Sequence, residues 1–200
     1  SGQANVVWLG SSTTVGGNAT TTERRYVNLV TDRLGGVEPV SRVGGSFPDR
    51  NTKPGVHGYL SAMGGTTSEN YINNTTRAFI LWERPSLIVH MIGSNDSIDA
   101  EPSAVTVEEY EANVAAEVDK INAGATVPVS QVLVHTYRRA GTSVAKWATY
   151  RDALVRIAST RALRVALPSA AILKMSRYSG AARLRATASA VTGSPFSAGQ

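Results

Sequence analysis

Short apolar runs alternate along the chain with segments in which apolar residues recur every three or four positions. The runs predict β-strands at residues 5–9, 56–63, 86–92, 127–136 and 164–167. The run at 86–92 is almost continuously apolar, which is typical of a parallel strand buried on both faces. The segments with helical spacing predict helices at residues 22–34, 69–79, 106–124 and 144–159. Because strands and helices alternate, the pattern predicts a three-layer α/β/α sandwich with a mostly parallel central sheet.

Local signals mark some of the boundaries between these elements. Thr106 with Glu109 three residues later forms the pattern of a capping box, which begins a helix. Gly35 and Gly36 predict the end of the helix before them. Residues 37–56 contain a glycine pair and two prolines and predict a loop.

Length and composition favour one globular domain. The chain has 200 residues, 42% of them hydrophobic, and no cysteine, so it can form neither a disulfide nor a thiolate metal site. It contains no apolar run of the roughly 20 residues that a membrane span needs, and no amino-terminal segment with the pattern of a signal peptide. We expect a single domain over residues 1–200, with its core at about 4–168, and leave the compartment and the oligomeric state open.

The net charge of +5 is confined to the end of the chain. Residues 1–152 hold 13 Lys and Arg and all 15 acidic residues, whereas residues 153–200 hold seven basic residues and no acid. This basic tail lacks the interleaved aromatic residues of a nucleic-acid surface, so we expect no nucleic-acid partner. We expect an atypical basic tail at about 169–200. Residues 181–200 lack a clear periodicity, and we expect the residues after about 180 to be mobile or loosely packed.

Three predicted strands end in glycine followed by polar residues, and these ends carry the candidate chemistry. The sequences are Gly10-Ser11-Ser12, Gly64-Gly65-Thr66-Thr67 and Gly93-Ser94-Asn95-Asp96. In a parallel sheet the carboxyl ends of the strands lie along one edge, where open α/β sheets bind ligands. A hydroxyl, a glycine N–H and a carboxamide would meet there, which is the set that acyl transfer requires.

These residues resemble the sequence blocks of the SGNH hydrolases, the GDSL-type esterases and lipases. Gly10-Ser11-Ser12 matches the Gly-Asp-Ser block with serine in place of aspartate, and Gly93-Ser94-Asn95-Asp96 matches the Gly-x-Asn-Asp block in full. The resemblance implies a flavodoxin-like sandwich and a serine esterase. It also implies that Ser12 is the nucleophile, and that the N–H groups of Ser12 and Gly64 and the side chain of Asn95 bind the oxyanion.

The sequence departs from the family in its catalytic base. The family supplies it from an Asp-x-x-His block near the carboxyl terminus, but this sequence has no histidine after His135 and no acid after Asp152. Three explanations stay open: an altered tail in a damaged enzyme, a base from elsewhere in the chain, or a binding relative that has lost catalysis.

The remaining polar candidates favour structural roles. Of the possible substitute bases, His135 lies near a strand end but is more simply a hydrogen-bonded strand residue, His90 lies within a buried strand, and His57 is expected to be exposed. We expect Asp96 to orient its loop as a hydrogen-bond acceptor. The pair Arg138 and Arg139 can hold a substrate anion, but a solvated turn is the simpler interpretation.

The sequence therefore predicts a hydrolase of short-chain carboxylic esters, such as acetyl or other acyl esters, that acts through an acyl-enzyme on Ser12. Its substrate is expected to be a small-molecule or carbohydrate ester. The donor set requires no cofactor, and the histidines and carboxylates do not have metal-site spacing, so we expect no metal. The alternative is a catalytically impaired module on the same scaffold that binds carbohydrate or ester ligands.

Overall fold

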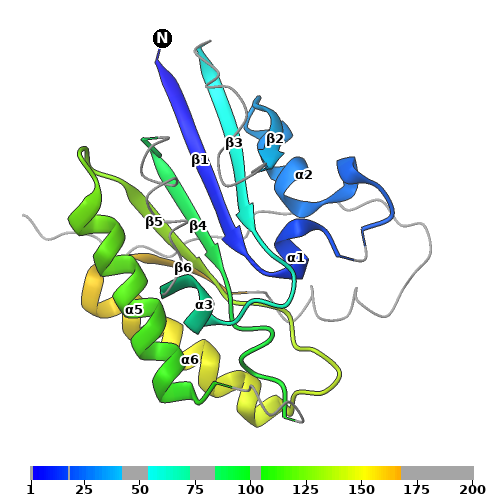
Figure 1. The fold of residues 1–200 in the computed structure, drawn as a ribbon, viewed down its shortest axis with the longest axis vertical. Coiled ribbons are helices and arrows are strands. Elements are labelled where there is room, and N and C mark those ends of the chain that lie inside the picture. The colour runs from blue at the N-terminus through cyan, green and yellow to red at the C-terminus, as the bar shows by residue number, and fades with distance from the viewer. Residues whose placement is uncertain (1, 18, 42–53, 73–83, 100–104, 168–200) are drawn as a thin grey trace, which may run out of the picture.

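A computed structural model describes residues 2–17, 19–41, 54–72, 84–99 and 105–167. Within these residues the chain forms one six-stranded sheet in the order β2-β3-β1-β4-β5-β6, and every neighbouring pair is parallel (Figure 1). The strands are β1 (Gln3–Gly10), β2 (Val37–Ser41), β3 (Gly55–Ala62), β4 (Leu87–Met91), β5 (Ser130–Val134) and β6 (Arg164–Ala166). Without β2, the order of the other five is that of a flavodoxin-like sheet, as the family resemblance implied.

Helices cover both faces of this sheet and confirm the predicted three-layer sandwich. They are α1 (Ser12–Val15), the 3₁₀ helix η1 (Thr22–Arg24), α2 (Tyr26–Arg33), α3 (Ser68–Ile72), α5 (Val107–Gly124) and α6 (Val144–Arg161). Figure 1 shows α5 and α6 packed side by side, whereas α2 lies apart from them beside β2 and β3. The predicted capping box at Thr106 is present, with both of its reciprocal hydrogen bonds to Glu109.

The alternation of side chains along β1 divides the core in two. Val7 and Leu9 pack into the larger cluster with residues of α3, α5 and α6. Val6 and Trp8 point to the opposite face, where they pack with Val27 of α2. Since β1 is buried on both faces, it forms the centre of the structure.

Two predicted boundaries were wrong. Residues 37–41, predicted as loop, form strand β2 at the edge of the sheet; Gly36 lets the chain approach β3 there, because a Cβ at this position would lie 2.9 Å from the carbonyl oxygen of Val56. The helix predicted to begin near Thr22 is split, since the extended backbone of Arg25 (ψ 140°) separates η1 from α2.

Some predictions concern residues outside the described ranges. They include most of the loop predicted at 37–56, the second half of the helix predicted at 69–79, and the tail at 169–200. The single-domain assignment stays a prediction.

Candidate active site

The three strands that end in glycine are neighbours, with β1 between β3 and β4. The register of the sheet aligns the last residues of these strands, Gly10, Ala62 and Met91. Ser12 and Gly64 each lie two residues beyond this row, and Asn95 lies four residues beyond it. After β1 the chain forms β2 and β3, which lie on one side of β1 within the sheet, and it then forms β4 on the other side of β1. The three residues therefore border a topological switch point.

Ser12 is the first residue of the four-residue helix α1, which follows β1 directly. Gly16 closes this helix in the left-handed region (φ 101°) and donates its N–H to the Ser12 carbonyl at 3.0 Å. The N–H of Ser12 belongs to the first turn, where a helix offers it no carbonyl acceptor. Ser12 is half-buried, so part of this residue is accessible to solvent.

Gly64 lies directly beside Ser12. A Cβ on Gly64 would be 4.0 Å from the Ser12 Cβ. The adjacent Met63 donates its N–H to the Gly10 carbonyl at 3.2 Å, which holds the two segments together. The structure thus brings Ser12 and Gly64 together as the sequence predicted.

Asn95 is held at both ends of its carboxamide. Its Nδ2 donates to the Thr66 carbonyl at 2.8 Å, and its Oδ1 accepts from Nη1 of Arg139 at 2.6 Å. Since a carbonyl only accepts and a guanidinium only donates, these partners fix which end of the amide is nitrogen. Among the described residues, none accepts the second hydrogen of Nδ2.

Ser94 and Asp96, on either side of Asn95, form buried hydrogen bonds to residues that follow other strands of the sheet. The hydroxyls of Ser94 and Ser11 share a hydrogen bond of 3.0 Å, so the serine that stands in place of the usual aspartate links β1 to β4. Asp96 is fully buried and accepts the Ser68 N–H at 2.8 Å, as expected for an orienting acceptor. Burial raises the pKa of this carboxyl above its ordinary value.

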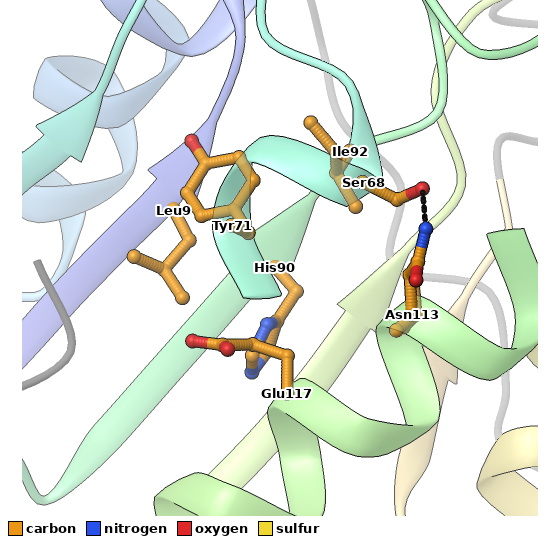
Figure 2. A pocket seen from close by; sticks show the side chains of 8 residues that line it. Leu9, Ser68, Tyr71, His90, Ile92, Asn113 and Glu117 are labelled. Atoms are coloured by element: carbon orange, nitrogen blue, oxygen red, sulfur yellow. Dashed lines mark hydrogen bonds between the residues drawn. The ribbon is translucent and has the colours of Figure 1, made fainter. Parts of the chain in front are cut away.

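Tyr71 is a site residue that the sequence did not reveal. Its hydroxyl accepts the Gly10 N–H at 2.8 Å and donates to the Gly10 carbonyl, two residues before Ser12. Figure 2 shows its ring beside Leu9 at a small cavity, with the hydroxyl directed away from Glu117. From the sequence, an aromatic residue in a helical segment is expected only to occupy a core position. The hydrogen bond of Tyr71 could not be predicted, because its partner is 61 residues away.

None of the three histidines lies beside Ser12. His57 pairs in register with Asn5, near the opposite end of the sheet, and it is buried rather than exposed as predicted. His90 lies within β4 and donates from Nε2 to Gln131 Oε1 at 2.8 Å, and burial lowers its pKa to about 4.

His135 follows β5, which β4 separates from β1, and adjacent strands are about 4.8 Å apart. Its ring packs against Trp147 of α6 with the ring centroids 4.4 Å apart, and burial lowers its pKa to about 4. We therefore place no general base among the histidines. Within the described ranges, no three His, Asp or Glu side chains gather as they would around a metal ion.

The two arginines after β5 differ in their environments. Arg138 is exposed and donates from Nη1 to the Thr142 carbonyl at 2.7 Å. Arg139 is half-buried and bonded to Asn95. The prediction of a solvated turn was therefore wrong for Arg139, because a contact 44 residues away in sequence orders its guanidinium.

A family model described as "GDSL-like Lipase/Acylhydrolase" matches residues 6–183. No curated protein matches the sequence. None of the described helices is both long and apolar enough to cross a membrane.

Solved structures of bacterial esterases share the fold. The acetylxylan esterase Axe2 from Geobacillus stearothermophilus is 17% identical with a TM-score of 0.60, over 88% of this chain and 81% of that chain. The psychrotrophic esterase EstA from Pseudoalteromonas sp., in a structure inhibited by monoethylphosphonate, is 15% identical with a TM-score of 0.60, over 82% and 76%. A lipase/acylhydrolase from Enterococcus faecalis is 17% identical with a TM-score of 0.59, over 81% and 74%.

Proposed function

Because the chain belongs to the family of GDSL-like lipases and acylhydrolases, which are carboxylic ester hydrolases, we propose that it cleaves short-chain esters through an acyl-enzyme on Ser12. The observation that carries this proposal is the placement of Ser12, Gly64 and Asn95 at the ends of three adjacent strands. The alternative of a non-catalytic binding module is not favoured by a family of lipases and acylhydrolases.

In the proposed reaction, the Ser12 oxygen attacks the ester carbonyl carbon and gives up its proton to a general base. The tetrahedral intermediate collapses, and the alcohol leaves after it has taken up a proton. Water then attacks the acyl-enzyme, and the carboxylic acid is released while Ser12 regains its proton. His57 lies near the opposite end of the sheet, and His90 is bonded to Gln131 within β4. His135 follows β5, which β4 separates from β1, so we assign the base to another group.

The oxyanion of the intermediate would be bound by three neutral donors. We assign these to the N–H groups of Ser12 and Gly64 and to the free hydrogen of Asn95 Nδ2. Neutral donors that are already ordered stabilise the developing charge without reorganisation, and each is worth about 2.7–4 kcal/mol in the transition state. Asn95 is ordered by Thr66 and Arg139 before any substrate binds, which supports this role.

The substrate class proposed is an acetyl or other short acyl ester. Axe2 is named as an acetylxylan esterase, so an acetylated carbohydrate is a suitable natural ester to assay beside 4-nitrophenyl acetate.

The nucleophile is tested by intact mass after exposure to a small phosphonofluoridate. The wild-type protein should gain one adduct that maps to Ser12, and Ser12→Ala should gain none. Thr13→Val removes the neighbouring hydroxyl and serves as the matched control, which should be labelled like the wild type. An unlabelled wild-type protein with an intact fold would refute the activation of Ser12.

The oxyanion donor is tested by turnover. Asn95→Ala should lower kcat on 4-nitrophenyl acetate by about 10²–10³-fold. A loss of less than threefold would exclude Asn95 from the oxyanion site.

A further inference from the structure

Arg139 reaches from the segment after β5 to the carboxamide of Asn95. Its Nη1 lies 2.6 Å from Asn95 Oδ1, a short distance for a hydrogen bond from a charged donor. Among the described residues it forms no ion pair, whereas Lys146, Arg151, Arg156 and Arg161 each pair with an acid. Arg139 is therefore directed to a neutral amide, although carboxylates are its usual partners.

This contact constrains the orientation of the Asn95 amide. The bond from Nδ2 to the Thr66 carbonyl holds one end, and Arg139 holds the other. With both ends fixed, the plane of the amide cannot turn about its side-chain torsion. The second N–H of Nδ2 then has one direction only.

The contact also changes the electronic character of the amide. A cation bonded to the carbonyl oxygen draws electron density from the amide nitrogen, so its N–H groups become stronger donors. A guanidinium stays charged at all working pH values, which makes this polarisation permanent.

We propose that Arg139 is a positioning residue that orients and polarises Asn95 as an oxyanion donor. This inference rests on the proposed function, because it assigns Arg139 a role through Asn95 and not through contact with the substrate. Since an oxyanion donor acts mainly in the transition state, loss of Arg139 should lower kcat and leave KM nearly unchanged.

The test is a double-mutant cycle on the neutral ester 4-nitrophenyl acetate. Arg139→Met removes the guanidinium and keeps an unbranched side chain, and it should lower kcat about tenfold, as expected for loss of one charged hydrogen bond. In an Asn95→Ala background the same substitution should have an effect of less than twofold, because its target is gone. Arg139→Lys, which keeps a charged donor, should recover part of the loss.

Arg138→Met is the matched control. It removes the same charge from the adjacent residue, whose guanidinium bonds to Thr142 instead of Asn95. It should change kcat by less than twofold, so a tenfold loss in this variant would attribute the effect to charge alone and overturn the proposal.

Two further kinetic outcomes would also overturn it. Equal losses from Arg139→Met in the wild-type and Asn95→Ala backgrounds would show that Arg139 acts independently of Asn95. A raised KM confined to the anionic ester mono-4-nitrophenyl succinate would show that Arg139 contacts the substrate. In both cases a 10²–10³-fold loss in Asn95→Ala alone would keep the proposed function. A loss of less than threefold in that variant would exclude Asn95 from the oxyanion site and refute the role of Arg139 with it.

A measurement without turnover completes the test. The Asn95 carboxamide signals in a ¹⁵N–¹H spectrum can be assigned by their loss in Asn95→Ala. They should shift in Arg139→Met and stay in place in Arg138→Met. Unshifted signals in Arg139→Met would overturn the proposal, whatever the activity of the protein.

Discussion

Replacing Tyr71 by phenylalanine should destabilise the protein by removing a single oxygen atom. Tyr71 is 8% exposed, and its hydroxyl bonds to both the N–H and the carbonyl of Gly10. Burial raises the pKa of this hydroxyl, so it stays protonated and able to donate at neutral pH. The substitution keeps the ring and its packing, so its effect reports on these hydrogen bonds.

The expected loss of unfolding free energy follows from the hydrogen bonds that Gly10 keeps and loses in Tyr71→Phe. The Gly10 carbonyl keeps the Met63 N–H at 3.2 Å, but both hydrogen bonds between Gly10 and the Tyr71 hydroxyl are lost. Each hydrogen bond contributes about 0.5–1.5 kcal/mol to stability. We therefore expect Tyr71→Phe to lower the free energy of unfolding by about 2 kcal/mol. At about 2–4 °C per kcal/mol for a chain of this size, Tm should fall by about 4–8 °C.

The assay is urea denaturation followed by circular dichroism at pH 7, with a thermal scan beside it. Tyr137→Phe is the matched control, because the Tyr137 side chain is 39% exposed, and it should change stability by less than about 0.5 kcal/mol. If Tyr71→Phe is as stable as Tyr137→Phe at an unchanged m value, the reasoning is refuted.

Two predictions concern stability against pH. Burial raises the pKa of Asp96, so its contribution to stability is complete below the ordinary carboxyl pKa and is lost as the pH rises through the folded value. Asp96→Asn should therefore gain stability relative to the wild type between pH 4 and pH 7, and a constant difference would contradict this. Burial lowers the pKa of His135 from 6.5 to about 4, so its contribution is complete above pH 6.5 and is lost as the pH falls toward 4. His135→Phe should reduce this acid-side loss of unfolding free energy in urea titrations, and an unchanged pH slope would refute the assignment.

The strands were largely predictable because burial on both faces of a parallel sheet imposes an apolar run on the sequence. The run at 86–92 corresponds to β4, and the capping box at Thr106 begins α5 as predicted. The edge strand β2 was not predictable in this way. It lies in a segment of prolines and glycines, and its pairing with β3 is visible only in three dimensions.

The candidate site likewise contains residues that could be predicted from the sequence and residues that could not. The placement of Ser12, Gly64 and Asn95 at one edge of the sheet was predictable because each follows a strand, and parallel strands place their carboxyl ends at one edge. Tyr71 and Arg139 were not, since their partners Gly10 and Asn95 lie 61 and 44 residues away. A helical aromatic residue and an arginine after a strand each have many possible environments.

The sequence by itself determined the layered α/β class, the parallel sheet and the glycine-ended strands that carry the candidate donors. These features depend on local periodicity and on backbone conformation, which neighbouring residues dictate. Only the tertiary structure decided that β1 lies between β3 and β4, that Asn95 is held at both ends, and that His135 packs against Trp147. Such pairings form between residues far apart in sequence, and their energy arises only when folding removes both partners from water.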